Sequence, residues 1–264
     1  MKILFWNTHK NENINQILSE LIVENNASIV VLAEYTADST DLITRVSNLG
    51  KRMFWYITTG CDRISILGSI DNVEAGRQTP HTSMQIINGK DILCGVHLQS
   101  QAYPDHEDRR KITINRLITD IRSLEEELGT ENTIIVGDFN INPYDNSCVG
   151  APYLHSLPVY ADTVRKKRTV AGEEFYMFYN PMWNLFGDFK SPHGTYYYSG
   201  SNTNNTFWNI YDQVIMRPEL RERFVDDSLR IIAKTSTESL LDENGHPNDR
   251  FSDHLPIIFE IREA

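Results

Sequence analysis

The sequence predicts an α+β fold in which two mixed β-sheets pack face to face and helices cover their outer sides. Two observations lead to this prediction. The start of the chain alternates short apolar runs with segments of helical periodicity, whereas the middle contains apolar runs with little helical periodicity between them. With 264 residues and 40% hydrophobic content the chain can fill one core, so we expect a single domain over residues 1–264.

The N-terminal part predicts strand, helix, strand, helix. An apolar run at 2–7 precedes a segment, 14–22, whose apolar residues recur at helical spacing. A β-branched run at 28–34 is typical of a buried strand. It precedes a second helical segment, for which we expect Ser39 as the N-cap and Gly50 as the stop.

The middle of the chain predicts strands. Apolar runs occur at 53–58, 64–69 and 82–87. Residues 88–89 are Asn-Gly, a strong hairpin signal because both residues tolerate the positive φ of a tight turn. Residues 92–98 are therefore expected to be the return strand.

The second half begins with helical periodicity over 105–128 and continues with further strands. We expect these strands at 133–139, 211–216, 228–233 and 255–261. Residues 172–211 are different, because many aromatic side chains lie there among Gly, Asn, Ser and Pro without periodicity. We expect long loops in this region, with aromatics that either pack onto the body or stack on nucleobases.

Charge and cysteine content exclude several classes of protein. The 25 basic and 36 acidic residues give a net charge of -11, which argues against binding nucleic acid through an overall positive potential. Basic runs at 109–111 and 165–168 are candidates for a local basic face, or are simply solvated surface. The three cysteines contain no C-x-x-C pair, so we expect neither disulfides nor a cysteine zinc site, and Cys94 should be a small core residue.

Targeting segments are not evident in the sequence. No apolar stretch approaches the roughly 20 residues that a membrane span needs. The N-terminal run lacks the long apolar core of a signal peptide. We therefore expect Met1 to begin a cytoplasmic protein.

Five scattered segments end or interrupt an apolar run with a carboxylate, an amide or an imidazole. They are residues 5–8 (Phe-Trp-Asn-Thr), 31–34 (Val-Leu-Ala-Glu), 95–98 (Gly-Val-His-Leu), 137–140 (Gly-Asp-Phe-Asn) and 252–256 (Ser-Asp-His-Leu-Pro). Each alone has an ordinary structural explanation, such as a polar turn or a solvated carboxylate. Together they provide oxygen ligands and histidines that can hold a hard divalent cation and activate a water. Their joint occurrence at strand ends predicts an active site.

In this order, the segments resemble the motifs of the endonuclease/exonuclease/phosphatase superfamily, which has the DNase I-like fold. The motifs at 137–140 and 252–256 are the most specific part of the resemblance, which extends from Asn7 to Pro256. Further matching positions are Trp6-Asn7, Glu34, Val96-His97-Leu98, Tyr211-Asp212 and the strand-like run 63–69. The resemblance implies a four-layer αββα sandwich with the site at one rim, a divalent cation, and hydrolysis of a phosphoester.

The resemblance also implies how a cation and an attacking water are held. It implies Mg²⁺, with Mn²⁺ as the alternative, bound by Glu34 as the main carboxylate with Asn7 and Asp253 beside it. Asp138 and Asn140 are implied to orient the attacking water, and Asn7 and Asn140 to contact the substrate phosphate. The chemistry agrees, because a cation screens the charge with which a phosphodiester repels a nucleophile.

Two histidines complete the implied catalytic set. His254 is implied to act at the scissile phosphate as base or hydrogen-bond donor, with Asp212 holding its ring. His97 is implied to contact the phosphate and to help protonate the leaving oxygen. Arg63 is implied as a further substrate contact. These roles suit the residues, since a histidine titrates near neutral pH and a carboxylate behind it fixes its tautomer.

The substrate is less clear, because the motifs depart from several subfamilies. Residues 33–36, Ala-Glu-Tyr-Thr, lack the Gln-Glu and Thr-Lys of abasic-site nucleases. Residues 137–143 do not match inositol-phosphate phosphatases, and Leu255 stands where tyrosyl-DNA phosphodiesterases have Trp. His97 resembles the DNase I-type branch.

We therefore expect a Mg²⁺-dependent nuclease or phosphodiesterase, such as an endonuclease, that acts on nucleic acid and needs no protein partner. One alternative is a phosphatase acting on a small phosphorylated metabolite or lipid headgroup. The other is a catalytically silent binding module, against which the retained polar set argues, because burying several carboxylates without a cation is costly.

Overall fold

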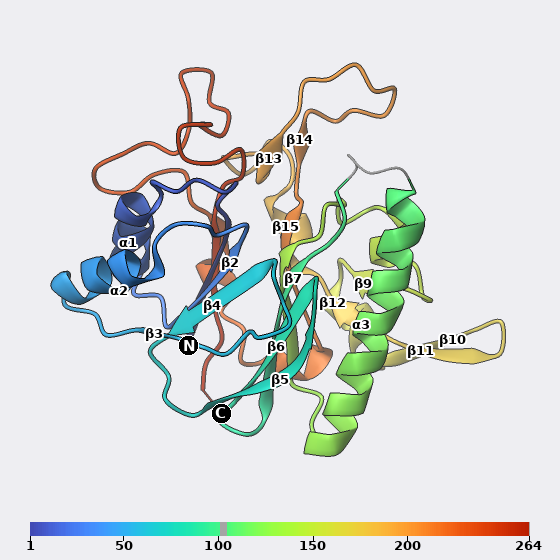
Figure 1. The fold of residues 1–264 in the computed structure, drawn as a ribbon. Coiled ribbons are helices and arrows are strands. Elements are labelled where there is room, and N and C mark those ends of the chain that lie inside the picture. Colours follow the sequence, from blue (N-terminus) through green and yellow to red (C-terminus); the bar gives the residue numbers. More distant parts are fainter. Residues whose placement is uncertain (101–104, 264) are drawn as a thin grey trace.

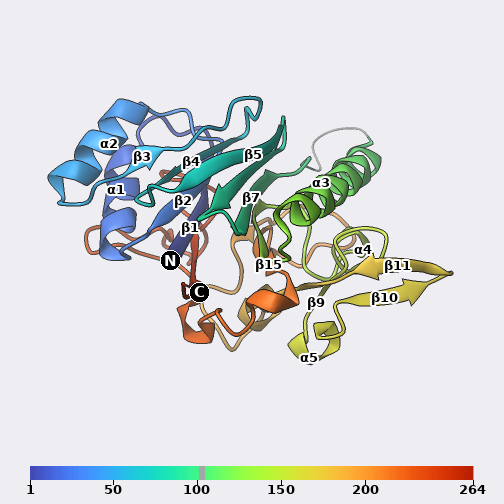
Figure 2. The ribbon, with the colours of Figure 1, turned by 90° about the horizontal axis from the view of Figure 1, so that it is seen from below.

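The computed structural model describes residues 1–100 and 105–263, and it shows two large β-sheets packed face to face with helices on both outer sides (Figures 1 and 2). This arrangement confirms the expected α+β sandwich. Helices α1 and α2 lie on one side of the molecule and α3 on the other (Figure 1). No helix in the described part of the chain combines the length and the apolar character that a membrane crossing requires.

The first sheet has six strands among the described residues, and β1 and β2 at its centre are parallel. All its other strand pairs are antiparallel. In spatial order the strands are β16 (Arg230–Ile231), β17 (Ile257–Glu260), β1 (Lys2–Asn7), β2 (Ile29–Ala33), β4 (Ile64–Gly68) and β3 (Phe54–Trp55).

The second sheet has seven strands among the described residues, and β7 and β8 at its centre are also parallel. The expected Asn88-Gly89 hairpin joins β6 to β7, and both residues have positive φ, 52° and 69°. In spatial order the strands are β5 (Val73–Thr79), β6 (Thr82–Ile87), β7 (Asp91–His97), β8 (Thr133–Asp138), β15 (Asp212–Met216), β12 (Phe178–Tyr179) and β9 (Ser156–Leu157).

Three longer helices supply the outer layers. Their bounds are Asn15–Glu24 for α1, Ser39–Asn48 for α2 and His106–Leu128 for α3. Shorter elements are α4 (Asn146–Val149), α5 (Tyr160–Thr163), the 3₁₀ turns η1 (Pro181–Leu185), η2 (Pro218–Leu220) and η3 (Asp226–Ser228), and two small hairpins, β10 (Lys167–Val170) with β11 (Glu173–Tyr176) and β13 (Tyr196–Tyr197) with β14 (Trp208–Asn209).

Apolar side chains fill the space between the sheets and the space under α3. Cys94, as expected, is a fully buried core residue in the layer between β7 and α3. The two sheets lie close together at Gly95 of β7, where a Cβ atom would lie 2.8 Å from Ile64 Cγ2 and 2.9 Å from Val31 Cγ1. The glycine therefore lets the two central strand pairs pack against each other.

Several local predictions were wrong. The N-cap of α2 is Asp38 rather than Ser39, because the Asp38 carboxylate accepts hydrogen bonds from the N–H groups of Thr40 and Asp41. Strand β5 was not expected, since its residues are mostly polar and partly exposed. Residues 172–211 are not loops throughout, because β12 within them joins the second sheet. Two-residue strands of this kind are too short to show a period of two in the sequence.

Candidate active site

The polar ends of the central strands meet at one rim of the sandwich, at the top of Figure 1. The parallel strands β1 and β2 end at Asn7 and Ala33, and Glu34 follows directly. The parallel strands β7 and β8 end at His97 and Asp138, which face each other in the register. Strand β15 runs antiparallel to β8 and places Asp212 opposite Asp138.

Asp138 lies at the centre of this rim and is almost completely buried. Its Oδ2 accepts hydrogen bonds from the amide groups of Asn7 and Asn140, each at 3.0 Å, and its Oδ1 accepts one from the Asn140 backbone N–H at 2.8 Å. Burial raises the pKa of Asp138 to about 7, although the neighbouring His254 lowers it. The carboxylate is thus held in one orientation and is more basic than an exposed aspartate.

Gly137 is required to bring Asp138 into this position. A Cβ atom at Gly137 would lie only 1.9 Å from the backbone oxygen of Val96 on the neighbouring strand. After Asp138 the chain turns through Asn140, which has a φ of 52°. A non-glycine residue in this region carries backbone strain, which the two hydrogen bonds from Asn140 to Asp138 offset.

Three contacts fix the position of His254. Its Nδ1 lies 2.8 Å from Asp212 Oδ2, and its backbone oxygen accepts a hydrogen bond from Trp6 Nε1 at 2.8 Å. Tyr196 covers the ring, with 4.8 Å between the ring centroids. Nε2 is therefore directed toward the rim, where it lies 4.0 Å from Asp138 Oδ2.

The charge state of His254 follows from these neighbours. Burial lowers the pKa of the ring, but the carboxylates of Asp212 and Asp138 outweigh that effect and raise it to about 10. The ring is therefore a cation at neutral pH, with its Nδ1–H donated to Asp212.

Glu34 and His97 form the other side of the rim. Glu34 has a φ of 52°, and its backbone N–H lies 3.4 Å from the backbone oxygen of Arg63. His97 Nε2 lies 3.6 Å from both Glu34 Oε1 and Asp138 Oδ2. Burial and then the Arg63 charge lower the pKa of His97 to about 3, so that its ring is neutral at pH 7.

The structure brings every residue predicted for the site to this rim, including Asp253. That carboxylate lies 4.0 Å from His254 Nε2, and its Oδ1 lies 3.0 Å from His9 Nδ1. Sequence reasoning missed two residues of the rim, His9 and Tyr196. His9 follows Asn7 closely, which was a usable signal, whereas Tyr196 was hidden among the other aromatics of 172–211.

The ligand atoms at this rim fit a hard divalent cation. Among the described residues, Asp138, Asp212 and His254 have potential ligand atoms within 4.8 Å of one another. Two of these groups are already paired with each other, whereas the Glu34 carboxylate accepts no hydrogen bond from a described residue. A free carboxylate beside a second buried carboxylate and an amide oxygen suits Mg²⁺, which prefers a few protein oxygens and keeps several waters.

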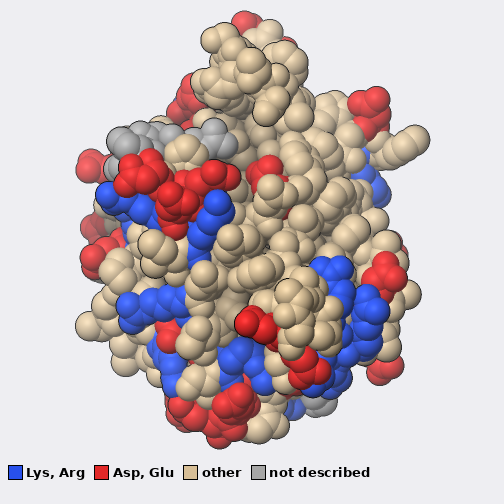
Figure 3. Space-filling model, turned by 90° about the vertical axis from the view of Figure 1, so that its right-hand side faces the viewer, with Lys and Arg blue, Asp and Glu red and all other residues tan. Residues whose placement is uncertain are grey.

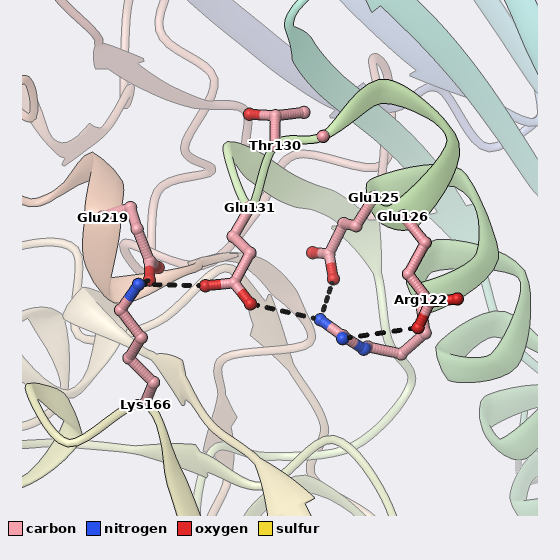
Figure 4. Close-up of a pocket in the computed structure, with 8 residues that line it drawn as sticks. Arg122, Glu125, Glu126, Thr130, Glu131, Lys166 and Glu219 are labelled. Atoms are coloured by element: carbon pink, nitrogen blue, oxygen red, sulfur yellow. Dashed lines mark hydrogen bonds and ion pairs between the residues drawn. The ribbon is translucent and has the colours of Figure 1, made fainter.

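A separate cavity of about 420 Å³ lies at the C-terminal end of α3. The charged side chains that line it pair with one another (Figure 4). Lys166 Nζ lies 3.1 Å from Glu131 and is also paired with Glu219. Arg122 lies 2.8 Å from Glu125. Because these charges satisfy one another, the cavity is not a second candidate for the site.

Comparisons with known proteins reveal relatives only at the level of structure. No family model matches the sequence, and no curated protein matches it. A 3'-5' exonuclease from Neisseria meningitidis is similar, with a TM-score of 0.58 at 15% identity over 100% of both chains. An AP endonuclease from Archaeoglobus fulgidus has a TM-score of 0.56 at 12% identity over 99% of both chains. Truncated TDP2 from Caenorhabditis elegans has a TM-score of 0.54 at 16% identity over 98% of this chain and 96% of that one. The chain therefore has the DNase I-like fold that the motifs implied.

Proposed function

We propose that this chain, as one domain of the endonuclease/exonuclease/phosphatase superfamily, is a divalent-metal-dependent phosphoesterase that hydrolyses phosphodiester bonds of nucleic acid. One observation carries the proposal. Six segments far apart in the sequence place two paired carboxylates, a free carboxylate, two amides and two histidines at one rim. The names of the similar structures, which include an exonuclease and an AP endonuclease, support the same class of reaction.

Glu34, Asn7 and Asp253 are the residues that we assign to the cation, Mg²⁺ or Mn²⁺. When bound, the cation screens the negative charge of the phosphate and polarises a phosphoryl oxygen. Glu34 is suited to this role because its strained backbone directs a carboxylate into the rim that no described residue engages in a hydrogen bond.

Asp138 and Asn140 orient the attacking water in this proposal. Asp138 is held by three hydrogen bonds and has a raised pKa, so it can accept a proton from the water as the new bond to phosphorus forms. The bond to the leaving oxygen breaks, and that oxygen takes its proton from solvent water. Asn7 and Asn140 also lie where an amide group can contact the phosphate. General base assistance of this kind is typically worth about 10²- to 10⁴-fold.

The two histidines have different charge states and therefore different roles. His254, a cation paired with Asp212, donates a hydrogen bond from Nε2 to a phosphoryl oxygen and stabilises the charge that develops there. His97 is neutral, so we assign it as a hydrogen-bond donor near the phosphate rather than as the acid that protonates the leaving oxygen. Arg63 approaches the same rim from β4 and contacts the substrate.

The surroundings of the site support nucleic acid as the substrate. The β13–β14 hairpin lies at the top of the molecule (Figure 1), and its Tyr196 contacts His254. Residues 195–211 contain no Asp, Glu, Lys or Arg. The projection at the top of Figure 3 is accordingly mostly uncharged. Tyr198 and Phe207 on this hairpin are 42% and 52% exposed, as aromatics that stack on unpaired bases must be.

The test is a substrate panel with and without a chelator. Single-stranded DNA, duplex DNA, RNA and several phosphomonoesters are incubated with Mg²⁺ or Mn²⁺, and we expect cleavage of polynucleotide that a chelator abolishes. Hydrolysis of small monoesters alone would favour the metabolite phosphatase and overturn the proposal.

Binding of the cation is tested separately from activity. Titration calorimetry with Mn²⁺ should show binding to the wild-type chain and at least about tenfold weaker binding to Glu34→Gln. The exposed Glu222→Gln is the matched control and should bind like the wild type. Equal affinity in Glu34→Gln would remove Glu34 from the cation site.

A further inference from the structure

A second cavity adjoins the rim on the His97 side, and the described residues that line it include no Asp or Glu. Its volume is about 360 Å³, and it is lined by Arg63, His81, Gln99, Arg109, Ile112 and Thr113. His81 links it to the site, because its Nδ1 lies 2.8 Å from the backbone oxygen of His97. In a chain with a net charge of -11, a cavity with two arginines and no carboxylate is an exception.

The hydrogen bonds in this cavity leave one hydroxyl proton free. A carbonyl oxygen can only accept, so His81 Nδ1 carries the proton and its Nε2 is an acceptor. Gln99 Nε2 then donates both to His81 Nε2, at 3.2 Å, and to Thr113 Oγ1, at 2.7 Å. Thr113 is therefore an acceptor in this chain of bonds, and its own O–H is available to a ligand.

The rest of this network is rigid. Arg110 is almost completely buried and donates from Nε and Nη2 to the backbone oxygen of Gln99, at 3.1 Å and 2.6 Å. Gln99 is thus held from its backbone and its side chain, and it fixes the position of Thr113 on α3.

Both arginines of the cavity have guanidinium nitrogens that pair with no residue in the described part of the chain. Arg63 forms no hydrogen bond or ion pair through its side chain with any described residue, and it lies close enough to His97 and His81 to lower the pKa of both. Arg109 uses Nε in an ion pair with Asp105, at 3.3 Å, which leaves its terminal nitrogens for another acceptor. Both residues are at least partly exposed, so a ligand can reach them.

We propose that this cavity binds a second phosphate of the substrate strand, next to the phosphate that is cleaved. The proposal rests on the proposed function, because it extends the same site along a polynucleotide. Two guanidinium groups and a hydroxyl donor match the several oxygens of a phosphate, and arginine is the side chain best suited to recognise them. The protein therefore selects substrates with at least two neighbouring phosphates over a single phosphodiester.

The test compares two substrates in the same variants. Bis(p-nitrophenyl) phosphate carries one phosphate, whereas a short single-stranded oligonucleotide carries several. We expect the ratio of kcat/KM for the oligonucleotide to kcat/KM for the small diester to fall about tenfold or more in Arg109→Gln and in Thr113→Val. The matched control is Arg116→Gln, which removes an exposed arginine of α3 that does not line the cavity, and its ratio should equal that of the wild type.

Oligonucleotide binding provides a second measurement that does not need turnover. Fluorescence anisotropy as a function of salt should give a slope of log K against log salt that is smaller by about 0.7 in Arg109→Gln, as expected for one lost contact to a single-stranded phosphate. Circular dichroism melting confirms that each variant is folded.

The outcomes separate the two proposals. If both substrates are cleaved and neither the ratio nor the salt slope differs between Arg109→Gln and Arg116→Gln, the phosphate site is refuted and the proposed function stands. If no phosphoester is cleaved by any variant, the proposed function fails, and the salt slope alone decides whether the cavity binds phosphate.

Discussion

Replacing Asp212 by Asn tests the assignment of His254 most directly. Asp212 is fully buried, and its carboxylate lies 2.8 Å and 3.1 Å from His254 Nδ1 through its two oxygens. Asn has nearly the same shape, so the packing around Tyr196 should be preserved. What changes is the charge, because the amide in Asp212→Asn cannot hold the His254 ring as a cation in the way that the Asp212 carboxylate does.

The expected loss of activity follows from the lost charge. If His254 must be a cation to stabilise the charge that develops on a phosphoryl oxygen, kcat should fall by about 10²- to 10³-fold, the size seen when one donor to a developing oxyanion is removed. Hydrolysis of an oligonucleotide by Asp212→Asn is compared with that by Asp188→Asn, an exposed site that forms no ion pair. Activity within tenfold of the wild type in Asp212→Asn would falsify the assignment.

Stability should change with a defined dependence on pH, measured in chelator so that no cation contributes. The pKa of His254 is raised in the folded chain to about 10, against 6.5 for an ordinary histidine. A raised pKa stabilises the fold fully below pH 6.5, and that contribution is lost as the pH rises toward 10. Urea denaturation should therefore show wild type and Asp212→Asn differing most below pH 6.5, by about 1.5–3 kcal/mol from the loss of a hydrogen bond between charged groups, and converging at alkaline pH. A difference that grows with pH would contradict the sign of this coupling.

Two further predictions concern the scaffold. Gly137→Ala should lower the free energy of unfolding by about 3 kcal/mol or more, because the new Cβ would overlap a backbone oxygen at 1.9 Å. Gly95→Ala should lower it less, because its new Cβ meets only side-chain carbons. Equal losses in urea denaturation would contradict the argument. Glu125→Gln should lower the free energy of unfolding by about 3–5 kcal/mol, because it leaves the buried Arg217 without its carboxylate. The exposed Glu126→Gln should leave stability unchanged, and neither change should alter kcat. A stable Glu125→Gln would show that the pair contributes little.

The central part of the fold was predictable because its strands are long and apolar. Strands β1 and β6 have the predicted bounds, and β2, β7 and β8 differ by one or two residues at their ends. Each of these strands has buried residues on both faces, so its apolar run is continuous and distinct from the flanking turns. Strands at the sheet edges were missed or overextended because only part of each is buried, as in β5.

The rim that forms the candidate active site was predictable for a related reason. Asn7, His97 and Asp138 each stand at the end of a central strand, so the register of the sheets fixes where they meet. His9 and Tyr196 could not be assigned in the same way, since they lie in connections whose paths depend on tertiary contacts. Tyr196 reaches His254 through an isolated bridge between their backbones and through its ring, neither of which the sequence indicates.

The residues of the second phosphate cavity show where sequence reasoning ends. His81, Gln99 and Thr113 belong to no motif, and each is an ordinary polar residue in the sequence. Their function in our proposal comes from one chain of hydrogen bonds, in which the carbonyl of His97 fixes a tautomer and the tautomer frees a hydroxyl on α3. Such a network is specified by atom positions rather than by residue spacing. Our two proposals therefore predict that catalysis and substrate length are separable, since the strand ends position the groups that we assign to catalysis, while helix α3 and the residue before β4 position the groups that we assign to the rest of the strand.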